Sequence, residues 1–103
     1  MEQRELSFAE VKALATKAGE REWQEFLIEG QEVLAPNCMG YDRAWMFFRN
    51  MDIQIPQEYS MRLCAIVVSK YGEVRTTADF VPDYTKCMEY LKTMSEHFCE
   101  RDL

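Results

Sequence analysis

The longest apolar run in the chain covers residues 61–69, and it is the best strand candidate in the sequence. Seven of these nine residues are apolar, three are β-branched, and the run is too short to cross a membrane as a helix. Beyond Gly72, polar and apolar residues alternate over residues 73–80, as in a strand with one solvent-exposed face. Glycine at position 72 suits the left-handed conformation of a short loop. The pattern therefore predicts an antiparallel β-hairpin.

The first strand of this hairpin is apolar on both faces, so each face needs a cover. Neighbouring helices can cover one of them. The other face, formed by Cys64, Ile66 and Val68, is left for a second cover from the same chain or from a partner. We therefore interpret Cys64, Ile66 and Val68 as a candidate homodimer interface.

Before the predicted hairpin, apolar residues recur at the spacing of an α-helix. Ser7 and Glu10 form a capping box, which predicts a helix that begins at Phe8 and ends at Gly19. Apolar residues recur on one side of a helical wheel over residues 20–34, which predicts a second helix directly after the first. The N-terminal third of the chain is thus expected to be a pair of helices.

Three more segments complete the predicted fold. Residues 41–51 show a third, short helical pattern, and residues 52–59 form a connector in which alternating isoleucines could add a short edge strand. Asp83 can cap a last helix with an apolar stripe. The sequence therefore predicts one compact α+β domain over residues 1–103, with three N-terminal helices, a β-hairpin and a C-terminal helix packed on the sheet.

The acidic composition limits the classes of partner. The chain has 12 basic and 18 acidic residues and a formal net charge of −6. A general nucleic-acid binder needs a basic stripe, and an electrostatic membrane anchor needs a basic surface, so neither direct nucleic-acid binding nor membrane binding is expected. No apolar segment with a basic start opens the chain, which predicts the absence of a signal peptide and a cytoplasmic location.

The negative charge is concentrated in the second predicted helix. Glu22, Glu25, Glu29 and Glu32 fall on one arc of its helical wheel. Like-charged neighbours three or four residues apart each destabilise a helix by about 0.2–0.5 kcal/mol. The arc is either an ordinary solvated face or a docking surface for a partner protein with a basic surface. We carry the docking surface forward as a hypothesis.

An apolar patch could supply the anchor of the same interface. Met46 and Phe47 interrupt the polar side of the third predicted helix, which makes that helix apolar almost all round. Such a helix is either central to the core or half of an interface. We therefore treat Met46 and Phe47 as candidate partner-binding residues.

The residues of catalytic and metal sites do not form a local pattern. His97 is the only histidine, and the four cysteines are separated by 26, 23 and 12 positions, which fits neither a zinc site nor a redox pair. The four glycines are scattered, so no phosphate-binding loop is present. We expect no metal, no cofactor and no enzymatic activity, and a cysteine site assembled only by the fold remains an alternative.

These observations favour an interaction protein that binds, and inhibits or regulates, a partner protein. The glutamate arc could imitate a row of phosphates, and in size and charge the chain is similar to small acidic inhibitors of phages and mobile elements, such as anti-CRISPR and anti-restriction proteins. A homodimeric adaptor subunit is the first alternative. A DNA-binding regulator is the second, because the junction at Gly19 resembles a helix-turn-helix, although its recognition helix would present glutamates to phosphate.

Overall fold

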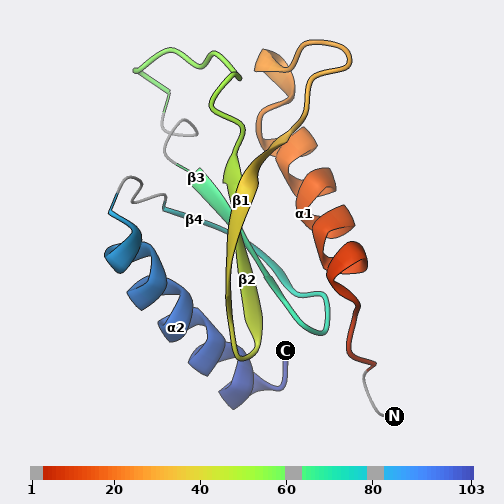
Figure 1. Cartoon of the computed structure of the whole chain (residues 1–103), viewed down its shortest axis with the longest axis vertical. Helices are drawn as coiled ribbons and strands as arrows, with labels where there is room; N and C mark the ends of the chain where they lie inside the picture. Colours follow the sequence, from red (N-terminus) through yellow and green to blue (C-terminus); the bar gives the residue numbers. More distant parts are fainter. Residues whose placement is uncertain (1–3, 60–63, 79–82) are drawn as a thin grey trace.

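The computed structural model describes residues 4–59, 64–78 and 83–103, and it shows two long helices on either side of a four-stranded sheet (Figure 1). The strands follow one another in chain order, and each pairs antiparallel with the next. Along the chain the elements are α1 (Phe8–Glu22), the short 3-10 helix η1 (Gln24–Phe26), β1 (Leu34–Tyr41), β2 (Ala44–Arg49), β3 (Cys64–Ser69), β4 (Val74–Ala78) and α2 (Tyr84–Arg101).

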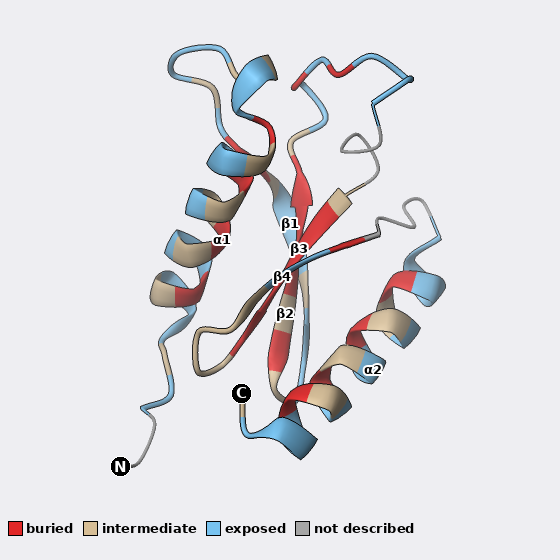
Figure 2. Ribbon diagram, turned by 180° about the vertical axis from the view of Figure 1, so that it is seen from behind, coloured by how far each residue is buried: buried red, intermediate tan, exposed pale blue. Residues whose placement is uncertain are grey.

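Each helix covers one face of the sheet, and each interface has its own core. Side chains of both layers are buried at each interface, and the outer sides of the helices are exposed (Figure 2). The core under α1 includes Val11, Ala15, Trp23, Phe47, Ile66 and Val68. The core under α2 includes Met46, Ala65, Val67, Cys87, Leu91 and Phe98. The second cover that the apolar strand requires is therefore a helix of the same chain.

The predicted α+β class holds, but the predicted arrangement of three N-terminal helices and a hairpin is wrong. Residues 20–34 contain the end of α1, then η1 and a loop, and residues 41–51 contain the end of β1, a turn and β2. Residues 45–48 are apolar almost without interruption because β2 is covered on both faces. A fully buried strand and a short buried helix cannot be distinguished by periodicity alone.

Gly19 was expected to end the first helix, but α1 continues to Glu22. A Cβ atom at Gly19 would lie 2.5 Å from Cγ1 of Val33 and 2.8 Å from Cζ3 of Trp23. The glycine therefore allows the segment that leads into β1 to pass close against the helix. Trp23 ends the helix one turn later, where its backbone N–H donates to the carbonyl of Gly19 at 2.9 Å.

The elements with strong local signals form as predicted. The capping box is present, since the backbone N–H of Glu10 donates to Oγ of Ser7 at 3.2 Å and the Glu10 carboxylate accepts from the backbone N–H of Ser7 at 3.1 Å. The hairpin of β3 and β4 turns at Gly72, which has a φ of 98°. The carboxylate of Asp83 accepts from the backbone N–H of Lys86 at 3.0 Å and caps α2. The part of the predicted strand at residues 61–63 lies outside the described residues.

The predicted edge strand in the connector does not form. Residues 52–59 are loop and turn, although Ile53 and Ile55 are both buried, with 1% and 7% of their surfaces exposed. The guanidinium of Arg49 donates to the carbonyl of Ile53, which holds the loop against the end of β2. The alternation of isoleucines therefore marks a loop that inserts side chains into the core and is not a strand.

Candidate functional site

The four glutamates of the predicted docking surface do not share a helix face. Glu22 is the last residue of α1, Glu25 lies in η1, Glu29 lies in a turn, and Glu32 lies in the extended segment before β1. The regular helical arc is therefore absent. The same residues still lie in one connection, between the end of α1 and the start of β1.

The other predicted site residues are in the two cores. Met46 and Phe47 have 0% and 2% of their surfaces exposed and point to opposite faces of the sheet, so they do not form a surface patch. Ile66 and Val68 are fully buried under α1, and Cys64 is partly buried against the same core. The face proposed for a homodimer is thus covered by the chain's own helix.

Two connections meet at one end of the molecule, which we call the acidic end and define as residues 20–33 and 50–59 (Figure 1). Asn50 joins them, because its backbone N–H donates to the carbonyl of Val33 at 3.1 Å and its side-chain amide donates to the carbonyl of Glu32 at 2.8 Å. The side-chain amide of Gln31 donates to the carbonyl of Asp52 at 3.1 Å. The two connections therefore form one continuous surface.

The whole net charge of the chain is located at this end. The acidic end contains seven acidic residues and one basic residue, Arg21, which gives the full −6, while the rest of the chain has eleven residues of each sign. Such a charge asymmetry creates a directed electrostatic field, whereas the same charge spread evenly would not. The acidic residues are Glu20, Glu22, Glu25, Glu29, Glu32, Asp52 and Glu58.

Exposed apolar side chains lie among these charges. Ile28 and Met51 are each 68% exposed, more than any other large hydrophobic side chain that the structure describes as exposed, and Tyr59 is 41% exposed. At the same end the ring of Phe26 contacts that of Tyr59, with centroids 5.2 Å apart, and Phe26 packs against the core under α1. The Tyr59 ring is therefore connected to the core through Phe26.

Metal-ligand clusters, disulfides and membrane-spanning helices are not found among the residues that the structure describes. Within residues 4–59, 64–78 and 83–103, no group of three or more His, Cys, Asp or Glu side chains is placed to hold a metal ion. None of the four cysteines, all of which lie in the described residues, forms a disulfide, and Cys87 is buried in the core under α2. None of the described helices has both the length and the apolar character needed to span a membrane. What the acidic end offers is exposed carboxylates beside exposed apolar groups.

The sequence pointed to the glutamates of residues 22–32 but missed the second half of the acidic end. Asp52, Glu58 and Met51 lie about 20 to 30 positions further along the chain, and only the fold places them beside the first connection. A count of charge by segment would have found the acidic bias of residues 20–33.

Comparisons with protein-family models, curated proteins and solved structures found no match.

Proposed function

We propose that the protein is a non-enzymatic interaction module that binds a basic surface of a partner protein through its acidic end. The observation that carries this proposal is the coincidence of two features at one end of the molecule. The complete net charge occurs there together with Ile28 and Met51, the two most exposed large hydrophobic side chains among the described residues. Charge complementarity selects a basic partner, and apolar side chains supply anchors that are buried on binding.

The two features have different roles in the proposed complex. The carboxylates act at long range and raise the association rate with a basic surface, and this effect weakens as salt increases. Ile28 and Met51 act at short range, where burial of an apolar side chain contributes about 1.5–3 kcal/mol. A change at the carboxylates should therefore mainly alter the association rate and salt dependence, and a change at the anchors should mainly alter dissociation.

Inhibition or regulation is the proposed consequence of binding. A partner that uses its basic surface to hold nucleic acid would have that surface blocked by the acidic end. The proposal does not depend on a regular row of carboxylates, since the glutamates occupy four different local structures. We place this activity in the cytoplasm, where the four free cysteines would remain reduced.

The test compares the partners bound by matched variants. The wild-type protein is immobilised and used to capture partners from the native host, and each captured protein is then purified and titrated against three variants. The acidic-end variant is Glu25→Lys with Glu29→Lys, the anchor variant is Ile28→Ser with Met51→Ser, and the control is Glu89→Lys with Glu96→Lys on the exposed side of α2. Circular dichroism establishes that each variant is folded.

We expect the acidic-end variant to bind at least tenfold more weakly at low salt and the anchor variant to bind at least tenfold more weakly at all salt concentrations. The control should bind like the wild type. If the captured partners bind both acidic-end and anchor variants with wild-type affinity, or if the control loses as much affinity as the acidic-end variant, the proposal is wrong.

A further inference from the structure

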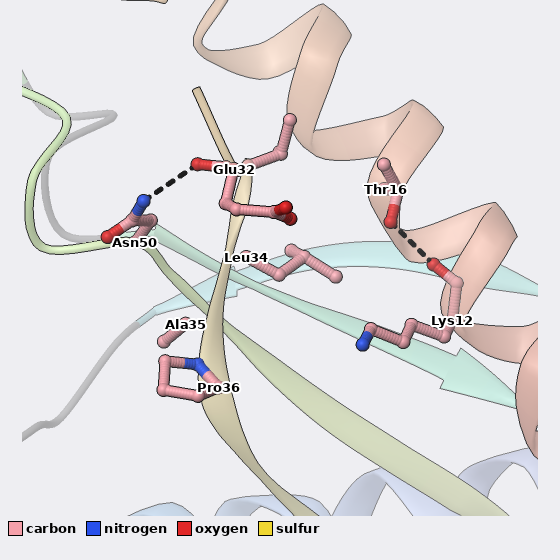
Figure 3. Close-up of a pocket in the computed structure, with 8 residues that line it drawn as sticks. Lys12, Thr16, Glu32, Leu34, Ala35, Pro36 and Asn50 are labelled. Atoms are coloured by element: carbon pink, nitrogen blue, oxygen red, sulfur yellow. Dashed lines mark hydrogen bonds between the residues drawn. The ribbon is translucent and has the colours of Figure 1, made fainter. Parts of the chain in front are cut away.

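A cavity of about 410 Å³ lies between α1 and the beginning of β1, beside the acidic end (Figure 3). This volume falls in the range of small-molecule sites, which is about 300–1,000 Å³. Its lining mixes charged, polar and apolar groups and comes from α1, from β1 and from the segments next to β1 and β2. The principal lining residues are Lys12, Thr16, Glu32, Leu34, Pro36 and Asn50.

The pairing of β1 with β2 is irregular at this cavity. Leu34 pairs with Arg49 and Cys38 pairs with Phe47, so residues 35–37 of β1 stand opposite the single residue Phe48. Irregular pairing of this kind redirects side chains and is frequent beside binding sites. Pro36, which lies in the irregular segment, has no backbone N–H to donate to another strand. This part of β1 is therefore better suited to border a cavity than to pair with a further strand.

Two opposite charges face the cavity from different walls. The Lys12 side chain extends from α1 and the Glu32 side chain from the segment before β1, and both point into the space between these elements (Figure 3). Among the described residues, neither Lys12 nor Glu32 forms an ion pair within 4.0 Å, whereas Arg4, Lys70 and Arg75 do. The cavity thus presents one cation and one anion that can each take a partner from a ligand.

Neighbouring polar groups hold these walls in place. The Thr16 hydroxyl donates to the carbonyl of Lys12 at 2.9 Å, which leaves the lone pairs of its oxygen available to accept. The side-chain amide of Asn50 donates to the carbonyl of Glu32 at 2.8 Å, and its oxygen accepts from the backbone N–H of Asp52 at 3.1 Å. The backbone at Glu32, whose carboxylate faces the cavity, is therefore held in place by Asn50.

We propose that this cavity binds a small zwitterion of amino-acid or dipeptide size. The ligand carboxylate pairs with the Lys12 ammonium, the ligand ammonium pairs with the Glu32 carboxylate, and an apolar side chain rests on Leu34. A ligand with only negative charge would face Glu32 without compensation, and a ligand with only positive charge would face Lys12 in the same way. This binding goes beyond the proposed partner interaction. The two share Glu32, but the partner interaction is tested at other residues of the acidic end.

The experiment titrates the full chain, labelled with ¹⁵N, with four probes. They are free leucine, the dipeptide alanyl-leucine, its N-acetyl form, which lacks the ammonium, and its C-terminal amide, which lacks the carboxylate. We expect alanyl-leucine or leucine to shift the amide resonances of residues 12–16 and 32–35, and we expect each blocked form to bind about tenfold more weakly than alanyl-leucine. If neither zwitterion shifts these resonances at about 10 mM, the cavity does not bind this class of ligand.

Single substitutions test which charge of the ligand pairs with Lys12 and which pairs with Glu32. Lys12→Met should weaken alanyl-leucine about tenfold and leave the amide form unchanged, while Glu32→Gln should weaken alanyl-leucine about tenfold and leave the N-acetyl form unchanged. Lys17→Met and Glu29→Gln, which remove the same charges outside the cavity, should bind like the wild type. Equal affinity in all variants, or an effect of only one of the two cavity variants, overturns the proposal. Because Glu25, Ile28, Glu29 and Met51 do not line the cavity, the failure of one proposal leaves the other standing.

Discussion

The two ends of the molecule use polar groups in opposite ways. At the end away from the acidic end, which we call the turn end, residues 4–6, the turns at 42–43 and 70–73, and Ser95 of α2 are linked to one another. The backbone N–H of Lys70 donates to the carbonyl of Arg43 at 2.9 Å, and the backbone N–H of Arg43 donates to Oγ of Ser95 at 2.9 Å. The backbone N–H of Leu6 donates to the carbonyl of Lys70 at 2.8 Å.

Charged side chains also differ between the turn end and the acidic end. The ammonium of Lys70 lies 2.8 Å from the carboxylate of Glu5, and the guanidinium of Arg4 lies 2.7 Å from that of Glu10. At the acidic end seven acidic residues face a single basic residue, so local pairing cannot neutralise them. The turn end uses its charges to join segments of the chain, whereas the acidic end carries an excess of carboxylates, which we propose to be available to a partner. The comparison shows that net charge in this protein is a property of one surface.

The largest expected effect comes from removing the side chain on which the acidic end rests. Trp23 is fully buried between α1 and the segment that leads into β1. Trp23→Ala should lower the free energy of unfolding by about 3–5 kcal/mol, because it leaves a cavity in the core. Chemical denaturation measures this change. Phe8→Ala, at an aromatic residue that is 48% exposed, is the control and should lower it by less than half as much. Equal losses would contradict the expectation that the buried Trp23 contributes more to stability than the half-exposed Phe8.

A smaller effect is expected at the turn end. Ser95 is 2% exposed and accepts from the backbone N–H of Arg43. Ser95→Ala should lower the free energy of unfolding by about 1–3 kcal/mol, because the N–H loses its partner in a partly buried place. Thr93→Ala, at an exposed position of the same helix, should change it by no more than about 0.5 kcal/mol. A neutral Ser95→Ala would mean that water replaces the hydroxyl and that the link between the turns and α2 is weak.

The smallest expected effect is a pH dependence near the start of α1. The hydrogen bond from the Arg4 guanidinium lowers the pKa of Glu10 from its usual 4.5 to about 2. Because the folded pKa is depressed, the ionised carboxylate stabilises the fold above pH 4.5, and this contribution is lost as the pH falls towards 2. Glu10→Gln keeps a capping side chain and removes the charge, so its stability deficit should shrink over this range.

Thermal unfolding of Glu10→Gln and wild type between pH 7 and pH 2 measures this difference. Glu29→Gln is the matched control, since Glu29 lies in a turn and takes no part in the capping box of Ser7 and Glu10. A Glu10→Gln deficit that stays constant down to pH 2 would contradict the assigned pKa.

Sequence reasoning was accurate where structure depends on a few adjacent residues. Ser7 with Glu10, Gly72 and Asp83 each act within four positions, and each forms the cap or turn that was predicted. It failed over residues 20–51, where a helical wheel and a sheet covered on both faces fit the same apolar residues. β1 in particular contains Pro36 and Gly40, which are tolerated because this strand lies at the edge of the sheet.

The candidate site was predictable only in part. The excess of carboxylates between Glu20 and Glu32 can be seen in the sequence, but their placement on one helix face was wrong because α1 ends at Glu22. Met46 and Phe47 were assigned to one helix that could belong to the core or to an interface. Both residues are in the cores, but strand geometry sends them to opposite faces of the sheet. The contribution of residues 50–59 and the opposing charges of Lys12 and Glu32 depend on contacts between distant segments, which no local pattern encodes.

The order of the strands in the sheet also bears on how the chain reaches this structure. Every strand pairs with the strand that follows it in the chain, so each pair of strands can form without the strands that come later in the sequence. The β1–β2 and β3–β4 connections, residues 42–43 and 70–73, are short, so these two hairpins close with little loss of chain entropy, while the β2–β3 connection over residues 50–63 is longer. We expect the meander to assemble hairpin by hairpin, with the helices docking on it from both sides.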